Sequence, residues 1–219
     1  QYLPSGFHQN GRLLKRAIRI DRRELAPEIF STAELKHTNQ LYTAKRQIEW
    51  LAGRFAAKSI VAELLTPAET ALSDIEIWPQ ADGSPQVKNF PDITISLSHS
   101  HQYAVCAATY ERISNDLGVD VEKVRGAPSI EFLDVGFTLK EIAALSGRSA
   151  TEIYRSWTIK EAYLKYKRRG FNENLHNVEV LKNCILDSGI PQDNLTVVSE
   201  PVFENYVFST VLNATTENC

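Results

Sequence analysis

Two acidic residues, Asp120 and Glu122, alternate with Val119 and Val121 in the segment 117–124. Alternate side chains of a β-strand point to opposite faces, so both carboxylates would lie on one face, about 7 Å apart. Such a pair can share Mg²⁺, which keeps several waters and completes its coordination with substrate phosphates. The same alternation is also typical of an ordinary half-buried strand with a polar face turned to solvent.

A second group of candidate residues lies on a predicted helix over 151–169. Trp157, Glu161 and Lys165 follow each other at intervals of four residues, which places them close to one line on a helix. We expect Trp157 to anchor the helix in the core while Glu161 and Lys165 project into a cleft. A carboxylate and an ammonium one turn apart suit a general base beside a phosphate-binding cation. The alternative is a surface Glu–Lys pair that contributes a few tenths of a kcal/mol.

A third group, Ser98 and His99, follows an apolar segment over 93–97 and precedes another over 103–109. This spacing predicts a loop between two strands, where side chains can meet a ligand. His99 would donate or accept a hydrogen bond at a phosphate or hydroxyl group, although a structural loop histidine fits the pattern too. There is no Gly-x-Ser-x-Gly motif of the kind that presents a hydrolase nucleophile.

Taken together, the three groups resemble the motifs of Sfp-type 4'-phosphopantetheinyl transferases, in the holo-acyl-carrier-protein synthase superfamily. The matching segments, in the family's order, are Leu97-Ser98-His99-Ser100, Gly118-Val119-Asp120-Val121-Glu122 and Trp157-Thr158-x-Lys160-Glu161-Ala162-x-x-Lys165. A weaker match, Lys45-Arg46 followed by Ala52-Gly53-Arg54, is similar to the family's basic N-terminal helix. Each motif alone is common, but the ordered set is specific.

The resemblance implies a role for each matching residue. Asp120, Glu122 and Glu161 would bind Mg²⁺, and Glu161 would also be the catalytic base. Lys165 would act in catalysis by contacting the pyrophosphate of coenzyme A.

The remaining matches imply a site for coenzyme A. Ser98 and His99 would contact its phosphates, and Arg46 and Arg54 would lie near its 3'-phosphate. Two departures from the family pattern concern this site: Ser84 replaces a lysine of a Gly-Lys-Pro triplet, and His101 replaces a glycine.

The activity implied is Mg²⁺-dependent transfer of 4'-phosphopantetheine from coenzyme A to a serine of an apo-acyl or apo-peptidyl carrier protein, with release of 3',5'-ADP. Two alternatives are another Mg²⁺-dependent phosphoesterase and a non-catalytic module that binds coenzyme A or a carrier protein. The phosphoesterase would need the carboxylates but neither the Ser-His-Ser segment nor the basic helix. The binding module would be expected to lack one of the three carboxylates, and this chain has all three.

Periodicity predicts an α+β fold. Apolar spacing predicts helices over 43–65 and 151–169, and a third helix begins at the Thr138–Glu141 capping box. Arg54 and Lys58 would lie at the edge of the apolar stripe of the first helix. Strands are predicted over 11–20, 93–97, 103–109, 117–124, 178–180, 195–198 and 206–212, and a loop or turn over 78–91. The elements divide into an N-terminal subdomain, 1–115, and a C-terminal subdomain, 116–219; the resemblance implies that they are related by a pseudo-twofold axis, with the active site between them.

Composition and charge narrow the class of protein. With 43% hydrophobic and 23% charged residues, the 219-residue chain is typical of a globular protein, and no apolar run is long enough to span a bilayer. Residues 1–60 hold eleven Lys and Arg residues against five acidic ones, a net charge of +6 in a chain of net charge −3. This basic first segment suits a polyanionic ligand or acidic partner, although an ordinary solvated surface fits the same charge pattern. It lacks the dense basic stripe with interleaved aromatic residues of a nucleic-acid-binding protein.

Three widely spaced cysteines without a CxxC motif, and the absence of a basic and apolar leader, favour a reduced, cytoplasmic protein. From the chain length we expect a monomer.

Overall fold

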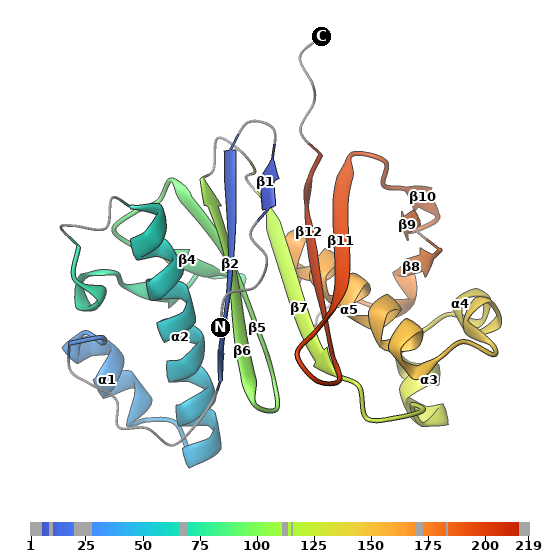
Figure 1. Cartoon of the computed structure of the whole chain (residues 1–219), viewed down its shortest axis with the longest axis horizontal. Helices are drawn as coiled ribbons and strands as arrows, with labels where there is room; N and C mark the ends of the chain where they lie inside the picture. The colour runs from blue at the N-terminus through green and yellow to red at the C-terminus, as the bar shows by residue number, and fades with distance from the viewer. Residues whose placement is uncertain are drawn as a thin grey trace, which may run out of the picture. The chain divides into compact units, whose positions relative to one another are not determined.

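The computed structural model describes residues 6–8, 11–19, 28–65, 70–110, 114, 116–169, 173–182 and 184–214. The chain forms two compact units, which we call unit 1 (Gln1–Leu117 with Thr215–Cys219) and unit 2 (Gly118–Ala214). Each unit combines helices with antiparallel strands, which confirms the predicted α+β class (Figure 1). In the described part of the chain, no helix is both long enough and apolar enough to cross a membrane.

The elements in chain order are β1 (Gly6–His8), β2 (Gly11–Arg19), α1 (Thr32–Thr38), α2 (Ala44–Leu64), η1 (Leu72–Asp74), β3 (Ile77–Pro79), β4 (Pro85–Val87), β5 (Ile93–Ser100), β6 (Tyr103–Tyr110), β7 (Leu117–Lys123), α3 (Ile130–Gly136), α4 (Leu139–Leu145), α5 (Ala150–Tyr166), η3 (Leu175–Asn177), β8 (Val178–Leu181), β9 (Cys184–Asp187), β10 (Ile190–Pro191), β11 (Leu195–Val202) and β12 (Tyr206–Asn213).

Unit 1 is built on a four-stranded antiparallel sheet in the order β1-β2-β6-β5, with the long helix α2 against it (Figure 1). Thr43 caps the start of α2 by accepting a hydrogen bond from the Arg46 amide. Small and branched side chains of α2, among them Ala56, Ala57 and Ile60, are fully buried against the sheet. Their spacing is the helical period that predicted this helix.

Unit 2 places α5 against a three-stranded sheet in the order β11-β12-β7, beside a smaller sheet, β10-β9-β8. Ile159, Ala162, Tyr163 and Leu164 of α5 form its core with residues of β8, β9 and β12. Ser149 caps α5 and forms a capping box with Glu152. The helix ends at Tyr166, three residues before the predicted end, and residues 170–172 lie outside the described part of the chain.

Several local predictions are wrong in instructive ways. The segment 78–91 is not a loop throughout, because β3 and β4 form a hairpin in it around Gly83, whose φ of 84° favours glycine. The short helices α1 and α3 were not predicted, and neither were β9 and β10. These elements are brief, so little periodicity is available to reveal them.

A buried ion pair fixes α1 to α2 in unit 1. Glu34 forms a capping box with Ser31 at the start of α1, and its carboxylate lies 2.6 Å from the ammonium of Lys58 on α2. Both side chains are completely buried, and Lys58 also donates to the carbonyl of Leu72 at 3.0 Å. The prediction that Lys58 lies at the edge of the apolar stripe is therefore wrong: it is a structural core residue.

Candidate active site

The strand β7 and the helix α5 of unit 2 touch backbone to backbone at Gly118. A Cβ atom built on Gly118 would lie 1.8 Å from the carbonyl oxygen of Ala162 and 2.6 Å from the amide nitrogen of Tyr166. No side chain fits this space, so only glycine allows the close approach. The glycine of the Gly-Val-Asp-Val-Glu segment thus sets the distance between the strand with Asp120 and Glu122 and the helix with Glu161 and Lys165.

Asp120 forms an ion pair with Lys165 across this contact. The Lys165 ammonium donates to Oδ1 of Asp120 at 2.8 Å. Val119 and Val121 are fully buried, and Asp120 itself is only 4% exposed. The alternative of a polar strand face turned to solvent therefore does not hold for Asp120, which is buried under α5 with a cationic partner.

Glu161 lies in surroundings that disfavour its charged form. It is buried, and its pKa is raised to about 7, chiefly because desolvation disfavours the charged form. The negative charges of Asp120 and Glu122 contribute to this rise, while Lys165 and Lys160 oppose it. Glu122 is half-buried. The structure therefore brings the predicted carboxylates within electrostatic reach of one another in one unit.

The donor chemistry of this cluster fits a hard divalent cation, because carboxylate oxygens are the ligands that Mg²⁺ prefers. The negative charges of Asp120 and Glu122 disfavour the ionised form of Glu161, and a bound cation would offset this effect. In the arrangement observed, no three His, Cys, Asp or Glu side chains among the described residues are grouped closely enough to hold a metal ion. The cation that contacts Asp120 here is Lys165.

The residue next to Glu161 is held rigidly, and this was not predicted. Lys160 is completely buried and donates to Glu141 at 2.7 Å, to the carbonyl of Gly136 at 2.8 Å and to that of Leu175 at 3.3 Å. Glu141 is the predicted capping-box residue of α4, and its other carboxylate oxygen accepts the amide of Val180 at 2.8 Å. Three elements of unit 2, α3, α4 and η3, therefore supply acceptors to the Lys160 ammonium of α5. The capping box was visible in the sequence, but its distant partner was not.

Trp157 holds the same helix against α3, as expected of an anchor. Its ring lies 4.9 Å from that of Phe132 and 6.1 Å from that of Phe137, measured between centroids. A Cβ on Gly136 would lie 2.7 Å from the Trp157 ring, so α3 ends directly on the indole. Trp157 itself is half-buried.

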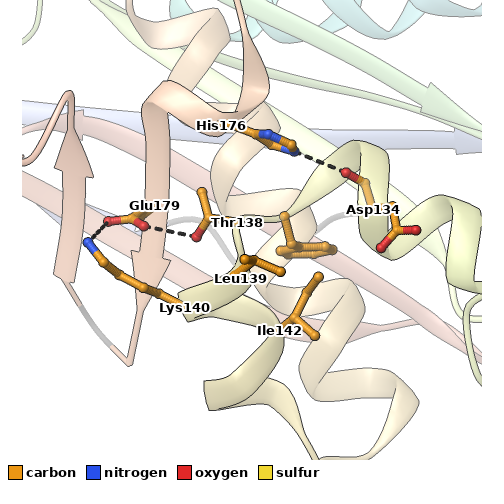
Figure 2. Close-up of a pocket in the computed structure, with 8 residues that line it drawn as sticks. Asp134, Thr138, Leu139, Lys140, Ile142, His176 and Glu179 are labelled. Carbon is orange, nitrogen blue, oxygen red and sulfur yellow. Dashed lines mark hydrogen bonds and ion pairs between the residues drawn. The ribbon is translucent and has the colours of Figure 1, made fainter.

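A pocket of about 480 Å³ lies between α4, the end of α3 and η3 (Figure 2). At its polar side Glu179 accepts from the Thr138 hydroxyl at 2.9 Å and pairs with Lys140 at 3.5 Å, as Figure 2 shows. His176 contacts the carbonyl of Asp134 at 3.0 Å. None of the predicted site residues lines this pocket.

In unit 1, Ser98 and His99 belong to a strand and not to a loop. They lie in β5, and the turn to β6 consists of His101 and Gln102 alone. Ser98 is buried, whereas His99 is exposed and has its Nε2 3.5 Å from Glu49 of α2. His101 has a φ of 51°, in the left-handed region that favours glycine, which accounts physically for a glycine at this position in the family pattern.

The two predicted arginines of α2 differ in their surroundings. Arg46 is exposed in the first turn. Arg54 donates to the carbonyl of Ile77 at 3.4 Å and lies over the Trp50 ring at 4.4 Å. Burial lowers the pKa of Arg54 to about 10. Arg54 is therefore engaged within unit 1, and Arg46 is the more accessible cation.

The comparisons with known proteins agree with this arrangement of motifs. Residues 116–207 match the model of the 4'-phosphopantetheinyl transferase superfamily, and residues 37–109 match that of the 4'-phosphopantetheinyl transferase N-terminal domain. A holo-[acyl-carrier-protein] synthase of Exiguobacterium sibiricum is 33% identical over 117 residues, which cover 50% of this chain and 85% of that protein. The chain therefore belongs to the 4'-phosphopantetheinyl transferase superfamily.

Two further proteins show how far the similarity extends. The 4'-phosphopantetheinyl transferase Sfp of Bacillus subtilis is 29% identical over 112 residues, which cover 49% of this chain and about half, 48%, of the Sfp chain. A crystal structure of a holo-(acyl-carrier-protein) synthase from Bacillus anthracis in complex with CoA (3',5'-ADP) is 25% identical. The structural alignment covers 45% of this chain and 93% of the Bacillus anthracis chain, with a TM-score of 0.41.

Proposed function

We propose that this chain is a 4'-phosphopantetheinyl transferase that moves the phosphopantetheine arm of coenzyme A onto a serine of an acyl or peptidyl carrier protein. The observation that carries the proposal is Glu161, a buried carboxylate with a pKa of about 7 beside Asp120 and Glu122. A carboxyl group with a pKa near neutrality is suited to proton transfer at physiological pH. Family membership supplies the reaction class, because the relatives are named as transferases and holo-carrier synthases.

In the proposed reaction, Glu161 accepts the proton of the carrier serine hydroxyl, directly or through one water molecule. The serine oxygen forms a bond to the β-phosphorus of coenzyme A, and the bond from this phosphorus to the bridging oxygen breaks. The leaving group is 3',5'-ADP, whose new negative charge Lys165 would stabilise. Asp120, Glu122 and Glu161 would hold Mg²⁺, which when bound supplies positive charge to the pyrophosphate.

Each unit supplies candidate residues for coenzyme A. From unit 2 we assign Lys165 to the pyrophosphate, and from unit 1 we assign Ser98 and His99 to the phosphates. For the 3'-phosphate, exposed Arg46 is the stronger candidate, because Arg54 already contacts Trp50 and Ile77. The monomeric state and the cytoplasmic location remain predictions; sedimentation analysis tests the first.

The experiment that tests the proposed function is incubation with coenzyme A, Mg²⁺ and a panel of apo-acyl and apo-peptidyl carrier proteins. We expect one carrier to gain the mass of a single phosphopantetheine, and the gain to be lost in Asp120→Asn and strongly reduced in Glu161→Gln. Phosphate release from a generic ester panel without carrier modification would favour a phosphoesterase instead. Binding of coenzyme A without transfer to any carrier would favour a binding module.

A further inference from the structure

Two lysines of α5, separated by about one turn, differ in burial and in the number of their hydrogen-bond partners. Lys160 is completely buried, and its ammonium donates to three acceptors from surrounding elements. Lys165 contacts Asp120 from the last turn of α5, and its side chain is 27% exposed against 6% for that of Asp120. One ammonium is therefore part of the core, while the other reaches a buried carboxylate from the surface.

Lys165 neutralises the negative charge of the buried Asp120 carboxylate. Burying a carboxylate without a counter-charge is costly, and the Lys165 ammonium supplies this charge to Asp120 at 2.8 Å. The same ammonium offsets part of the repulsion among the carboxylates around Glu161. An ammonium and a divalent cation cannot both contact the same oxygen at close range without strong mutual repulsion.

We propose that Lys165 is a place-holding cation that competes with the divalent metal ion for Asp120 until the pyrophosphate of coenzyme A draws it away. This inference rests on the proposed function, because it takes Asp120 as a metal ligand and Lys165 as the pyrophosphate contact. Lys165 has the flexible four-carbon stem and the exposed side needed to move between two anions. Metal and coenzyme A would then help each other bind, since each favours the position of Lys165 that the other requires.

The inference predicts a gain of metal affinity from the loss of a lysine, which a merely structural role would not produce. An opposite charge beside a carboxylate changes the affinity of that carboxylate for a proton by roughly 10- to 1,000-fold. Without coenzyme A, Lys165→Met should therefore bind Mn²⁺ at least about tenfold more tightly than the unmodified protein. Free Mn²⁺ in such a titration is measured by electron paramagnetic resonance.

Two control variants test whether the change in Mn²⁺ affinity is due to the positive charge of Lys165 itself. Lys165→Arg keeps the cation and should retain the weak Mn²⁺ binding of the unmodified protein. Lys167→Met removes a positive charge two residues further on, at the C-cap of α5, and should change Mn²⁺ affinity much less. Far-UV circular dichroism on each protein confirms that the fold is intact before titration.

The outcomes for this inference and for the proposed function are distinct. If Lys165→Met binds Mn²⁺ no more tightly than the unmodified protein while Asp120→Asn weakens binding, the metal site stands and the competition is wrong. If Asp120→Asn leaves Mn²⁺ affinity unchanged, the metal assignment of the proposed function is wrong, and the competition with it. In the Asp120→Asn background, the tightening by Lys165→Met should disappear.

Discussion

At the scale of single residues, Glu161 shows how burial brings the pKa of a carboxylate close to neutrality. The motif fixes its place in the chain, but its pKa of about 7 results from desolvation and from two acids on the neighbouring strand. The motif resemblance implied that Asp120, Glu122 and Glu161 belong together. It could not predict that Asp120 is buried, because alternation alone does not say which face of a strand a helix covers.

The raised pKa of Glu161 makes stability depend on pH. The folded state keeps the Glu161 proton up to about pH 7, whereas the unfolded chain releases it near the ordinary value of 4.5. The folded state therefore loses stability as pH rises through this window, by on the order of 3 kcal/mol if Glu161 acts alone. Glu161→Gln removes this loss, so its stability relative to the unmodified protein should increase from pH 4.5 to pH 8.

Urea unfolding of both proteins with a metal chelator, at several pH values, measures this difference. Other titrating groups contribute to both proteins and cancel in the comparison. A difference that stays constant with pH would show that Glu161 does not carry the raised pKa in the metal-free protein.

At the scale of elements, the two units use the same device to fix their long helices. In unit 1 the capping-box residue Glu34 pairs with Lys58 of α2, and in unit 2 Glu141 pairs with Lys160 of α5. In both units a phenylalanine directly precedes the helix-capping residue. The Phe30 ring lies 5.6 Å from the Lys58 ammonium in unit 1, and the Phe137 ring lies 5.1 Å from the Lys160 ammonium in unit 2. This repetition is a physical basis for the predicted similarity of the two halves.

These buried pairs are also where prediction from the sequence failed. A lysine on a helix is usually a surface residue, and nothing local distinguishes Lys58 or Lys160 from one. Their partners lie 24 and 19 residues away in the sequence and meet them only in the folded chain. The long helices and paired strands, in contrast, follow from apolar periodicity and were predicted closely.

Removing one partner of the buried Lys160–Glu141 pair should strongly destabilise unit 2. Lys160→Met leaves Glu141 without its cation in the core, which typically costs about 3–5 kcal/mol. The matched control is Lys140→Met, which removes a 74% exposed ammonium from Glu179 and should cost at most about 1 kcal/mol. Denaturant unfolding gives both values, and equal small effects would contradict the structural role of Lys160.

The contact between β7 and α5 gives an independent test of packing. Gly118→Ala places a methyl group 1.8 Å from a backbone oxygen, so the helix must move and stability should fall by about 3 kcal/mol or more. Gly53→Ala is the matched control, because its Cβ would meet nothing within 4 Å inside α2. Helix propensity predicts that this control gains up to about 1 kcal/mol. A fully stable Gly118→Ala protein would contradict the close approach.

At the scale of the whole molecule, the two units differ in charge at corresponding places. Five residues after the buried lysine, α2 carries Glu63 and α5 carries Lys165, and each pairs with the neighbouring strand. The strand partner is Arg16 in unit 1, at 2.7 Å, and Asp120 in unit 2, at 2.8 Å. The polarity is reversed, so the strand of unit 2 offers a carboxylate to a cation where that of unit 1 offers a guanidinium.

The end of α5 is where we expect an acidic carrier protein to dock. Lys167, Arg168 and Arg169 follow Glu161 and Lys165 in the chain, and a basic surface should attract an acidic partner. Arg169 is a poor site for mutation, because it pairs with Glu173 and Asp187 and so contributes to unit 2 itself. Arg168 is exposed, and its φ of 52° places it just beyond the helix.

Charge reversal at Lys167 and Arg168 should therefore weaken carrier binding selectively. We expect Lys167→Glu/Arg168→Glu to raise the KM for the carrier protein severalfold and to leave the KM for coenzyme A unchanged, because rim charges act mainly on association. The control is Arg148→Glu, an exposed cation that precedes the start of α5, about 25 Å away along the helix. Steady-state kinetics at two salt concentrations measure both constants, and the carrier KM of the unmodified enzyme should rise with salt as screening increases. An unchanged carrier KM in the double variant would place docking elsewhere, for which the basic residues of the first sixty positions are the next candidates.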